Sequence, residues 1–307
     1  MQKVVCLFPG QGSQTVGMGR ALFENSVAAR AVFEEADSAL GFSLSRLCFE
    51  GPEEELRDTV NAQPAIMAVS VACLRAVQGE GLVDLSSPLF MAGHSLGEYS
   101  ALVAAHVLDF SEAVRLVRER GRLMQYASAL RPGGMAAIIG LDETPLEEVC
   151  QQTGTQIGNI NSAEQIVISG PSDGIARAVD LARARGARKA IPLDVSGAFH
   201  SYLMQPAVGG MAKAVSDLRL SPPSVPIVAN CTARPIRTVD EVRVELVKQI
   251  CHPVQWHRSV EYMLQAGADT FVEIGPGRTL SSLVKRLNKD VTTLNIDGSR
   301  PTVESKP

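Results

Sequence analysis

The chain has 307 residues, of which 45% are hydrophobic and 20% are charged, and its formal net charge is −4. This composition is typical of a globular protein with enough length for a large core and a second, smaller domain. The slightly acidic balance gives no support to a nucleic-acid-binding protein. We expect no membrane partner, since we identify no apolar run near the roughly 20 residues of a membrane span and no signal-peptide layout at the N-terminus.

Six cysteines are scattered along the chain, without a C-x-x-C pair or a spacing typical of zinc sites. They are Cys6, Cys48, Cys73, Cys150, Cys231 and Cys251. We therefore predict reduced thiols, a cytoplasmic location and no metal site.

The apolar residues 4–8 predict a first strand, which a glycine-rich loop follows at residues 9–14. Backbone N–H groups of such a loop can face a ligand or an oxyanion. Thr15 stands where a dinucleotide-binding G-x-G-x-x-G motif needs its third glycine, and no Gly-Lys-Ser/Thr ending indicates a P-loop. A plain turn remains the alternative. Residues 21–76 are predicted mostly helical, with a buried helix over residues 65–77.

Residues 93–97 read Gly-His-Ser-Leu-Gly, the G-x-S-x-G pattern of a nucleophile elbow. An apolar run at residues 88–92 predicts a strand before it, and helical spacing over residues 98–108 predicts a helix after it. This context places Ser95 on a sharp strand-to-helix turn and puts the N–H of Leu96 at a helix N-terminus, facing any oxyanion formed beside Ser95. A chance match in a tight turn is the alternative.

A helix predicted over residues 111–128 carries one unusual cation. At about 100° per residue, Arg120 falls on the apolar face with Leu116, Leu123 and Met124. A buried guanidinium cannot lose its proton and needs an anionic or strongly polar partner. That partner is either a structural carboxylate from elsewhere in the chain or the carboxylate of a substrate.

Residues 131–195 show a pattern of their own, strand–helix–strand–strand–helix–strand. This order predicts a split βαβ, or ferredoxin-like, unit inserted into the larger domain. Its hairpin consists of residues 156–161 and 165–169. We assign residues 129–196 to this insertion, residues 1–128 and 197–297 to a discontinuous α/β domain with a parallel sheet, and residues 298–307 to a loose tail.

His200 is the one histidine in a loop at the predicted domain junction, where a general base could meet a nucleophile from another segment. Its alternative role is structural, as a histidine at the domain junction that makes its hydrogen bonds within the protein. Helices are predicted after it at residues 204–217, 240–250 and 279–287, and strands at residues 225–230 and 270–274.

Five motifs occur in a fixed order: residues 10–14, residues 93–99, Arg120-Gly121, residues 197–201 and residues 273–277. Together they resemble the malonyl-CoA:acyl carrier protein transacylases, the stand-alone relatives of the acyltransferase domains of fatty acid and polyketide synthases. The resemblance covers about residues 1–297, and the five motifs jointly are highly specific. It implies an α/β-hydrolase-like core with a ferredoxin-like insertion, malonyl-CoA and acyl carrier protein as partners, and no cofactor.

The resemblance also implies roles for single residues. Ser95 would be the nucleophile, His200 its general base, and Arg120 the partner of the malonyl carboxylate. The N–H groups of Gln11 and Leu96 would form the oxyanion hole, and the main-chain carbonyl of Gln249 would orient His200. Asn161 would line the site, and Phe199 and Met124 would contact substrate. A bulky Phe199 resembles the malonyl-type sequence, which predicts malonyl in preference to methylmalonyl.

The acid of a catalytic triad is not identifiable in the sequence. Asp142, Asp173, Asp180 and Asp194 stand between Ser95 and His200 as the hydrolase order requires, but none follows the required strand pattern. The family resemblance and this absence both favour a Ser-His dyad.

Two basic clusters are candidates for docking an acidic carrier protein, because attraction must be local in a chain of net negative charge. The preferred cluster is Lys285, Arg286 and Lys289 at the end of the last helix, and the other is Arg183, Arg185, Arg188 and Lys189. A solvated face is the alternative for each.

Two other function classes remain open at this stage. A serine esterase or thioesterase would share the elbow but let water resolve the acyl-enzyme, and a non-catalytic docking module would not use Ser95. Fatty acid synthesis is the expected pathway, with a polyketide synthase lacking its own acyltransferases as the alternative. We expect a monomer.

Overall fold

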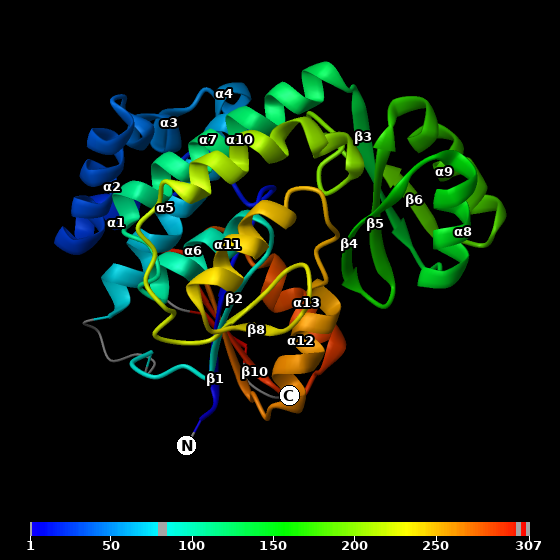
Figure 1. Cartoon of the computed structure of the whole chain (residues 1–307). Coiled ribbons are helices and arrows are strands. Elements are labelled where there is room, and N and C mark those ends of the chain that lie inside the picture. The colour runs from blue at the N-terminus through cyan, green and yellow to red at the C-terminus, as the bar shows by residue number, and fades with distance from the viewer. Residues whose placement is uncertain (1, 79–84, 299–301, 305–307) are drawn as a thin grey trace.

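A computed structural model describes residues 2–78, 85–298 and 302–304, the last three by their backbone alone. The chain forms a mixed α/β structure with two separate sheets (Figure 1). The larger sheet has the strand order β11-β10-β9-β1-β2-β7-β8. Its strands are β1 (Val4–Phe8), β2 (Phe90–Gly93), β7 (Ile227–Val228), β8 (Pro235–Ile236), β9 (Thr270–Ile274), β10 (Thr292–Ile296) and β11 (Thr302–Glu304).

The central strands of this sheet run parallel, which confirms the predicted parallel sheet. β1 pairs with β2 on one side and with β9 on the other, and β2 also pairs with β7. Phe8 lies opposite Gly93 in the register. Since parallel strands end at the same edge, the loops after β1, β2 and β7 meet there and bring Gln11, Ser95 and Asn230 to one place.

Helices cover both faces of the larger sheet. The helices of this unit are α1 (Arg20–Asn25), α2 (Val27–Leu40), α3 (Leu44–Glu50), α4 (Glu53–Arg57), α5 (Thr59–Val77), α6 (Leu96–Ala104), α7 (Phe110–Leu130), α10 (Gln205–Ser216), α11 (Val239–Lys248), α12 (Trp256–Gln265) and α13 (Thr279–Leu287), with a 3₁₀ turn at Tyr202–Met204.

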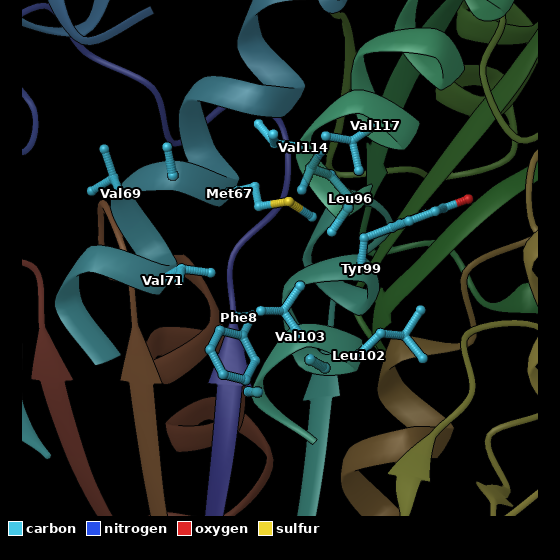
Figure 2. Close-up of a cluster of buried hydrophobic side chains, with 14 of the residues drawn as sticks. Phe8, Met67, Val69, Val71, Leu96, Tyr99, Leu102, Val103, Val114 and Val117 are labelled. Carbon is cyan, nitrogen blue, oxygen red and sulfur yellow. The ribbon is translucent and has the colours of Figure 1, made fainter. Parts of the chain in front are cut away.

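Side chains of β1 alternate between two hydrophobic cores, as the period of a strand requires. Val4, Cys6 and Phe8 face the core formed with α5, α6 and α7, whereas Val5 and Leu7 face the core formed with α12 and α13. Figure 2 shows the first core, with Phe8 from the strand beneath side chains of the three helices. This burial on both faces makes the sheet a rigid base for the site.

One core helix meets the criteria for a membrane span by length and composition alone. The helix α5 has 19 residues and contains an 18-residue window with a mean hydropathy of 1.4, of which 72% is buried inside the protein. Its side chains pack against the sheet and neighbouring helices, as a core helix does. The absence of a membrane partner stays a prediction.

The smaller sheet is antiparallel, with the order β4-β5-β3-β6. Its elements follow in the chain as β3 (Gly133–Ile139), α8 (Glu143–Thr153), β4 (Gln156–Ser162), β5 (Gln165–Pro171), α9 (Ser172–Ala184) and β6 (Lys189–Pro192). Both helices pack on one face of this sheet around a separate core (Figure 1). The hairpin predicted around residues 162–164 is confirmed.

The structure also differs from the predicted elements. The loose tail is wrong for Thr302–Glu304, which pair with β10 as an antiparallel edge strand, while residues 299–301 and 305–307 lie outside the described residues. The strand predicted over residues 225–230 shrinks to Ile227–Val228. The sequence analysis missed β8, β10 and α12, the first because a two-residue strand is too short for a periodic pattern.

Candidate active site

Ser95 lies on the sharp turn between β2 and α6, as the elbow pattern predicts. Its backbone angles are φ 51° and ψ −105°, outside the regions that non-glycine residues ordinarily adopt. The flanking glycines are required by space, because a Cβ on Gly93 would lie 2.0 Å from the carbonyl of Gly97, and one on Gly97 would lie 2.0 Å from Phe8 O. The two glycines therefore let the turn close against β1.

His200 meets Ser95 from a loop more than 100 residues away in the chain. Its Nε2 lies 2.7 Å from Ser95 Oγ, and its Nδ1 lies 2.9 Å from the main-chain oxygen of Gln249. This bond to a carbonyl fixes the proton on Nδ1 and leaves Nε2 as an acceptor for the serine proton. The backbone of His200 is also left-handed, at φ 55°.

The environment keeps His200 neutral. Burial, followed by the positive charge of Arg120, lowers the pKa of the imidazole to about 3 from its ordinary value of 6.5. At neutral pH the ring is therefore unprotonated, which is the state that a general base needs.

Arg120 is fully buried and lies directly beneath the serine. Its guanidinium donates to Ser95 Oγ at 3.2 Å, to Gln249 Oε1 at 2.8 Å and to Gln63 Oε1 at 2.7 Å. These partners are neutral, and no ion pair in the described parts of the chain involves Arg120. The structural ion pair considered from the sequence is thus not formed, and the cation faces the nucleophile.

The predicted oxyanion donors flank the serine from two elements. Leu96 is the first residue of α6, so its N–H has no partner within the helix. Gln11 comes from the loop after β1, which approaches the elbow closely: a Cβ on Gly10 would lie 2.3 Å from His94 O. Both N–H groups therefore belong to segments held next to Ser95.

A cleft of about 630 Å³ opens above these residues between the two sheets. Ser95, His200 and Gln11 line it, together with the buried side chains of Met124 and Phe199. Asn161 does not line this cleft. Its Oδ1 lies 2.9 Å from Nε2 of His94, and Asn159 from the same strand lines the cleft instead.

Sequence reasoning missed several buried polar residues around Ser95 and His200. Asn230 accepts the N–H of Ser95 at 2.7 Å, and Glu98 accepts the N–H of Asn230 at 2.8 Å and the side-chain amide of Gln249. Glu98 stood within the elbow motif, and a carboxylate on a helix that is otherwise apolar could have indicated it. Asn230 belongs to no sequence pattern that could have indicated its role.

Residues from both basic clusters, which were alternative docking sites in the sequence analysis, line one groove. A groove of about 610 Å³ between the β4–β5 turn and α13 is lined by Arg188 and Lys189 from the first cluster and by Arg286 and Lys289 from the second. Lys285 is not among its lining residues. Arg286 also donates to Gln165 Oε1 at 3.2 Å and so joins α13 to the small sheet.

Comparisons with known proteins identify the family of the chain. Residues 5–301 match the family described as acyl transferase domain. The chain is 43% identical over 301 residues to the malonyl CoA-acyl carrier protein transacylase of Bacillus subtilis, covering 96% of this chain and 94% of the relative. It is 43% identical over 296 residues to the enzyme of that name from Escherichia coli K12, with 95% of each chain covered.

Solved structures give the same result. The acyl-carrier-protein S-malonyltransferase of Bartonella henselae superposes with a TM-score of 0.93 at 44% identity, covering 97% of this chain and 96% of that one. A malonyl-transacylase solved in complex with a holo type II polyketide synthase acyl carrier protein superposes with a TM-score of 0.92 at 39% identity, with 96% of each chain covered. The chain therefore belongs to the malonyl CoA-acyl carrier protein transacylase family of acyltransferases.

Proposed function

We propose that this acyltransferase moves a malonyl group from malonyl-CoA to the phosphopantetheine thiol of an acyl carrier protein, through a malonyl ester on Ser95. The observation that carries the proposal is the convergence on one hydroxyl of a neutral histidine at 2.7 Å and a buried cation at 3.2 Å. A dyad explains acyl transfer, and the cation explains selection of an acyl group that ends in a carboxylate.

Acylation begins when His200 Nε2 removes the Ser95 proton and Oγ attacks the thioester carbonyl. The resulting oxyanion accepts hydrogen bonds from the N–H groups of Gln11 and Leu96, and one such donor typically lowers a barrier by about 3 kcal/mol. When the tetrahedral intermediate collapses, His200 returns the proton to the departing CoA thiolate.

Transfer to the carrier reverses these steps. The carrier thiol gives its proton to His200 and attacks the malonyl ester, and Ser95 leaves with the proton. These steps use no metal or redox cofactor. Among the residues that the structure describes, no three His, Cys, Asp or Glu side chains cluster as metal ligands would.

The site also favours malonyl over the branched methylmalonyl group. Phe199 and Met124 both line the cleft and are buried. One methyl group is worth only about 1–3 kcal/mol in an apolar pocket, so the preference is expected to be incomplete.

The carrier docks, in this proposal, along the groove lined by Arg188, Lys189, Arg286 and Lys289. Asn161 lines the adjoining surface beside Arg286 and bonds His94, which lines the catalytic cleft. A carrier bound to these cations would thus lie next to the cleft that its phosphopantetheine arm must enter.

We also propose a fold family for each of the two units. The larger unit is α/β-hydrolase-like, supported by its parallel sheet and elbow, and the insertion at residues 129–196 is ferredoxin-like, supported by the strand order β4-β5-β3-β6. We further propose a cytoplasmic monomer that serves fatty acid synthesis, with a polyketide synthase as the alternative user.

The experiment that tests the function measures both possible products. The enzyme is incubated with malonyl-CoA and a holo acyl carrier protein, and malonyl-carrier and free malonate are quantified by mass spectrometry. We expect malonyl-carrier as the main product. Malonate as the main product, at the same rate with or without carrier, would identify a thioesterase instead.

A further inference from the structure

The backbone of Ser95 is held by two side chains from distant segments. Asn230 Oδ1 accepts the Ser95 N–H at 2.7 Å, and the side-chain amide of Gln249 donates to the Ser95 carbonyl at 3.0 Å. Both polar groups of a residue in a left-handed conformation are thus fixed. Such a conformation persists only where the surroundings determine it.

Asn230 is itself held at every polar group. Its side-chain Nδ2 donates to Gly93 O at 2.7 Å, its N–H donates to Glu98 Oε1 at 2.8 Å, and its carbonyl accepts from Gln255 N at 2.8 Å. The residue is 1% exposed. Its amide therefore spans the elbow between the last residue of β2 and the serine, and cannot rotate away without breaking buried hydrogen bonds.

We propose that Asn230 is a positioning residue, which holds Ser95 in its left-handed conformation and occupies the Ser95 N–H. This proposal rests on Ser95 being the nucleophile. The occupied N–H cannot donate to the substrate, so the donors left for the oxyanion are those of Gln11 and Leu96. Asn230 touches neither substrate nor reacting atoms in this account and acts through the geometry of Ser95 alone.

Loss of Asn230 should therefore slow acylation without weakening substrate binding. A misplacement of about 1 Å can reduce a rate roughly 100-fold. We expect Asn230→Ala to lower the acylation rate at saturating malonyl-CoA by between about 10-fold and 100-fold, with the half-saturating concentration changed by less than about 3-fold.

A matched control separates positioning from general destabilisation. Asn295 on β10 is also buried, at 2% exposure, and its side chain accepts from Ser281 Oγ at 2.8 Å, away from the dyad. Asn295→Ala should retain acylation within about 3-fold, even if its melting temperature falls as far as that of Asn230→Ala.

The measurement is the time course of malonyl adduct formation by intact mass, together with melting temperatures for both variants. Equal losses of rate in the two variants, or a rate within about 3-fold of wild type for Asn230→Ala, would overturn the proposal. If Asn230→Ala does not fold, Asn230→Leu, which has a similar volume but no acceptor for the Ser95 N–H, is judged by the same criteria. Failure of the wild type to form any adduct would instead reject Ser95 as the nucleophile.

Discussion

At the scale of single residues, backbone strain gathers at the dyad. Four non-glycine residues in the described parts of the chain have positive φ, and two of them are Ser95 and His200. Each such conformation costs about 1–3 kcal/mol, and it persists because the surrounding hydrogen bonds allow no other arrangement. With these backbone conformations, Ser95 Oγ and His200 Nε2 lie 2.7 Å apart.

Removing Arg120 tests its selectivity for a carboxylate. Arg120→Ala should reduce malonyl transfer by about 2–5 kcal/mol in kcat/KM, because one desolvated charged contact is lost. Acetyl transfer from acetyl-CoA should fall much less, since acetyl offers no carboxylate. The ratio of the two rates also corrects for any disturbance of Ser95 and Gln249, which bond Arg120. Equal losses for both substrates would refute the role.

The low pKa of His200 predicts how the acylation rate depends on pH below neutrality. The base works when it is neutral, and the ring is neutral above its pKa, which burial and Arg120 lower to about 3. The rate of Ser95 acylation should therefore stay nearly constant as pH falls through 6.5, the ordinary histidine value. Stopped acylation reactions between pH 8 and pH 5 would measure it, with circular dichroism as a check on folding. A halving of the rate near pH 6.5 would contradict the shift.

At the scale of elements, the elbow could be predicted because its signals are local. Apolar residues, two glycines and a helical pattern stand within one short stretch, and the structure forms β2, the turn and α6 from it. The parallel sheet and the βαββαβ order were predictable for the same reason, since long periodic segments keep their type.

The buried polar residues that hydrogen-bond Ser95 and Arg120 could not be predicted in this way. Asn230 lies 135 positions from Ser95, and Gln63 lies 57 positions from Arg120. Their partners are set by the strand order of the sheet and by helix packing, which no local pattern contains. For Asn161 the strand was predicted correctly, but the position of the side chain was not. The Asn161 side chain hydrogen-bonds His94, and Asn159 lines the cleft.

The same substitution, glycine to alanine, made separately at two positions tests how closely the elbow packs. Gly97→Ala places a Cβ 2.0 Å from Phe8 O, so we expect destabilisation by about 1–3 kcal/mol or more and loss of activity. Gly209→Ala on α10 meets no atom within 4 Å and should stabilise the protein by about 0.4–1 kcal/mol. Denaturant unfolding measures both. Similar changes in the two variants would show that the close packing of the elbow has no energetic effect.

At the scale of the whole molecule, the small sheet is joined to the large unit beside the dyad. Ile160 N donates to Val254 O and Val254 N donates to Gly158 O, both at 2.9 Å, so Val254 of the large unit pairs with β4 of the small sheet. Arg57 on α4 also pairs with Asp194 at 3.2 Å across the cleft. These contacts link the two walls of the cleft, and the basic groove lies at the same boundary.

Charge reversal in the groove tests carrier docking. Arg286→Glu with Lys289→Glu should raise the KM for carrier protein and leave acylation by malonyl-CoA nearly unchanged, with an effect that shrinks as salt screens charges beyond about 10 Å at 0.1 M. Arg115→Glu with Arg219→Glu, two exposed arginines outside the groove, changes net charge equally and is the control. An equal effect of both pairs at low salt would place docking elsewhere.

The covalent intermediate is the central claim, and one measurement tests it most directly. The enzyme is incubated with malonyl-CoA, its intact mass and modified peptide are determined, and holo acyl carrier protein is then added. We predict one malonyl group on Ser95, lost from the enzyme as an equal amount appears on the carrier, and no adduct on a folded Ser95→Ala variant. Carrier malonylation at an undiminished rate by Ser95→Ala, or an adduct on another residue, would contradict the account.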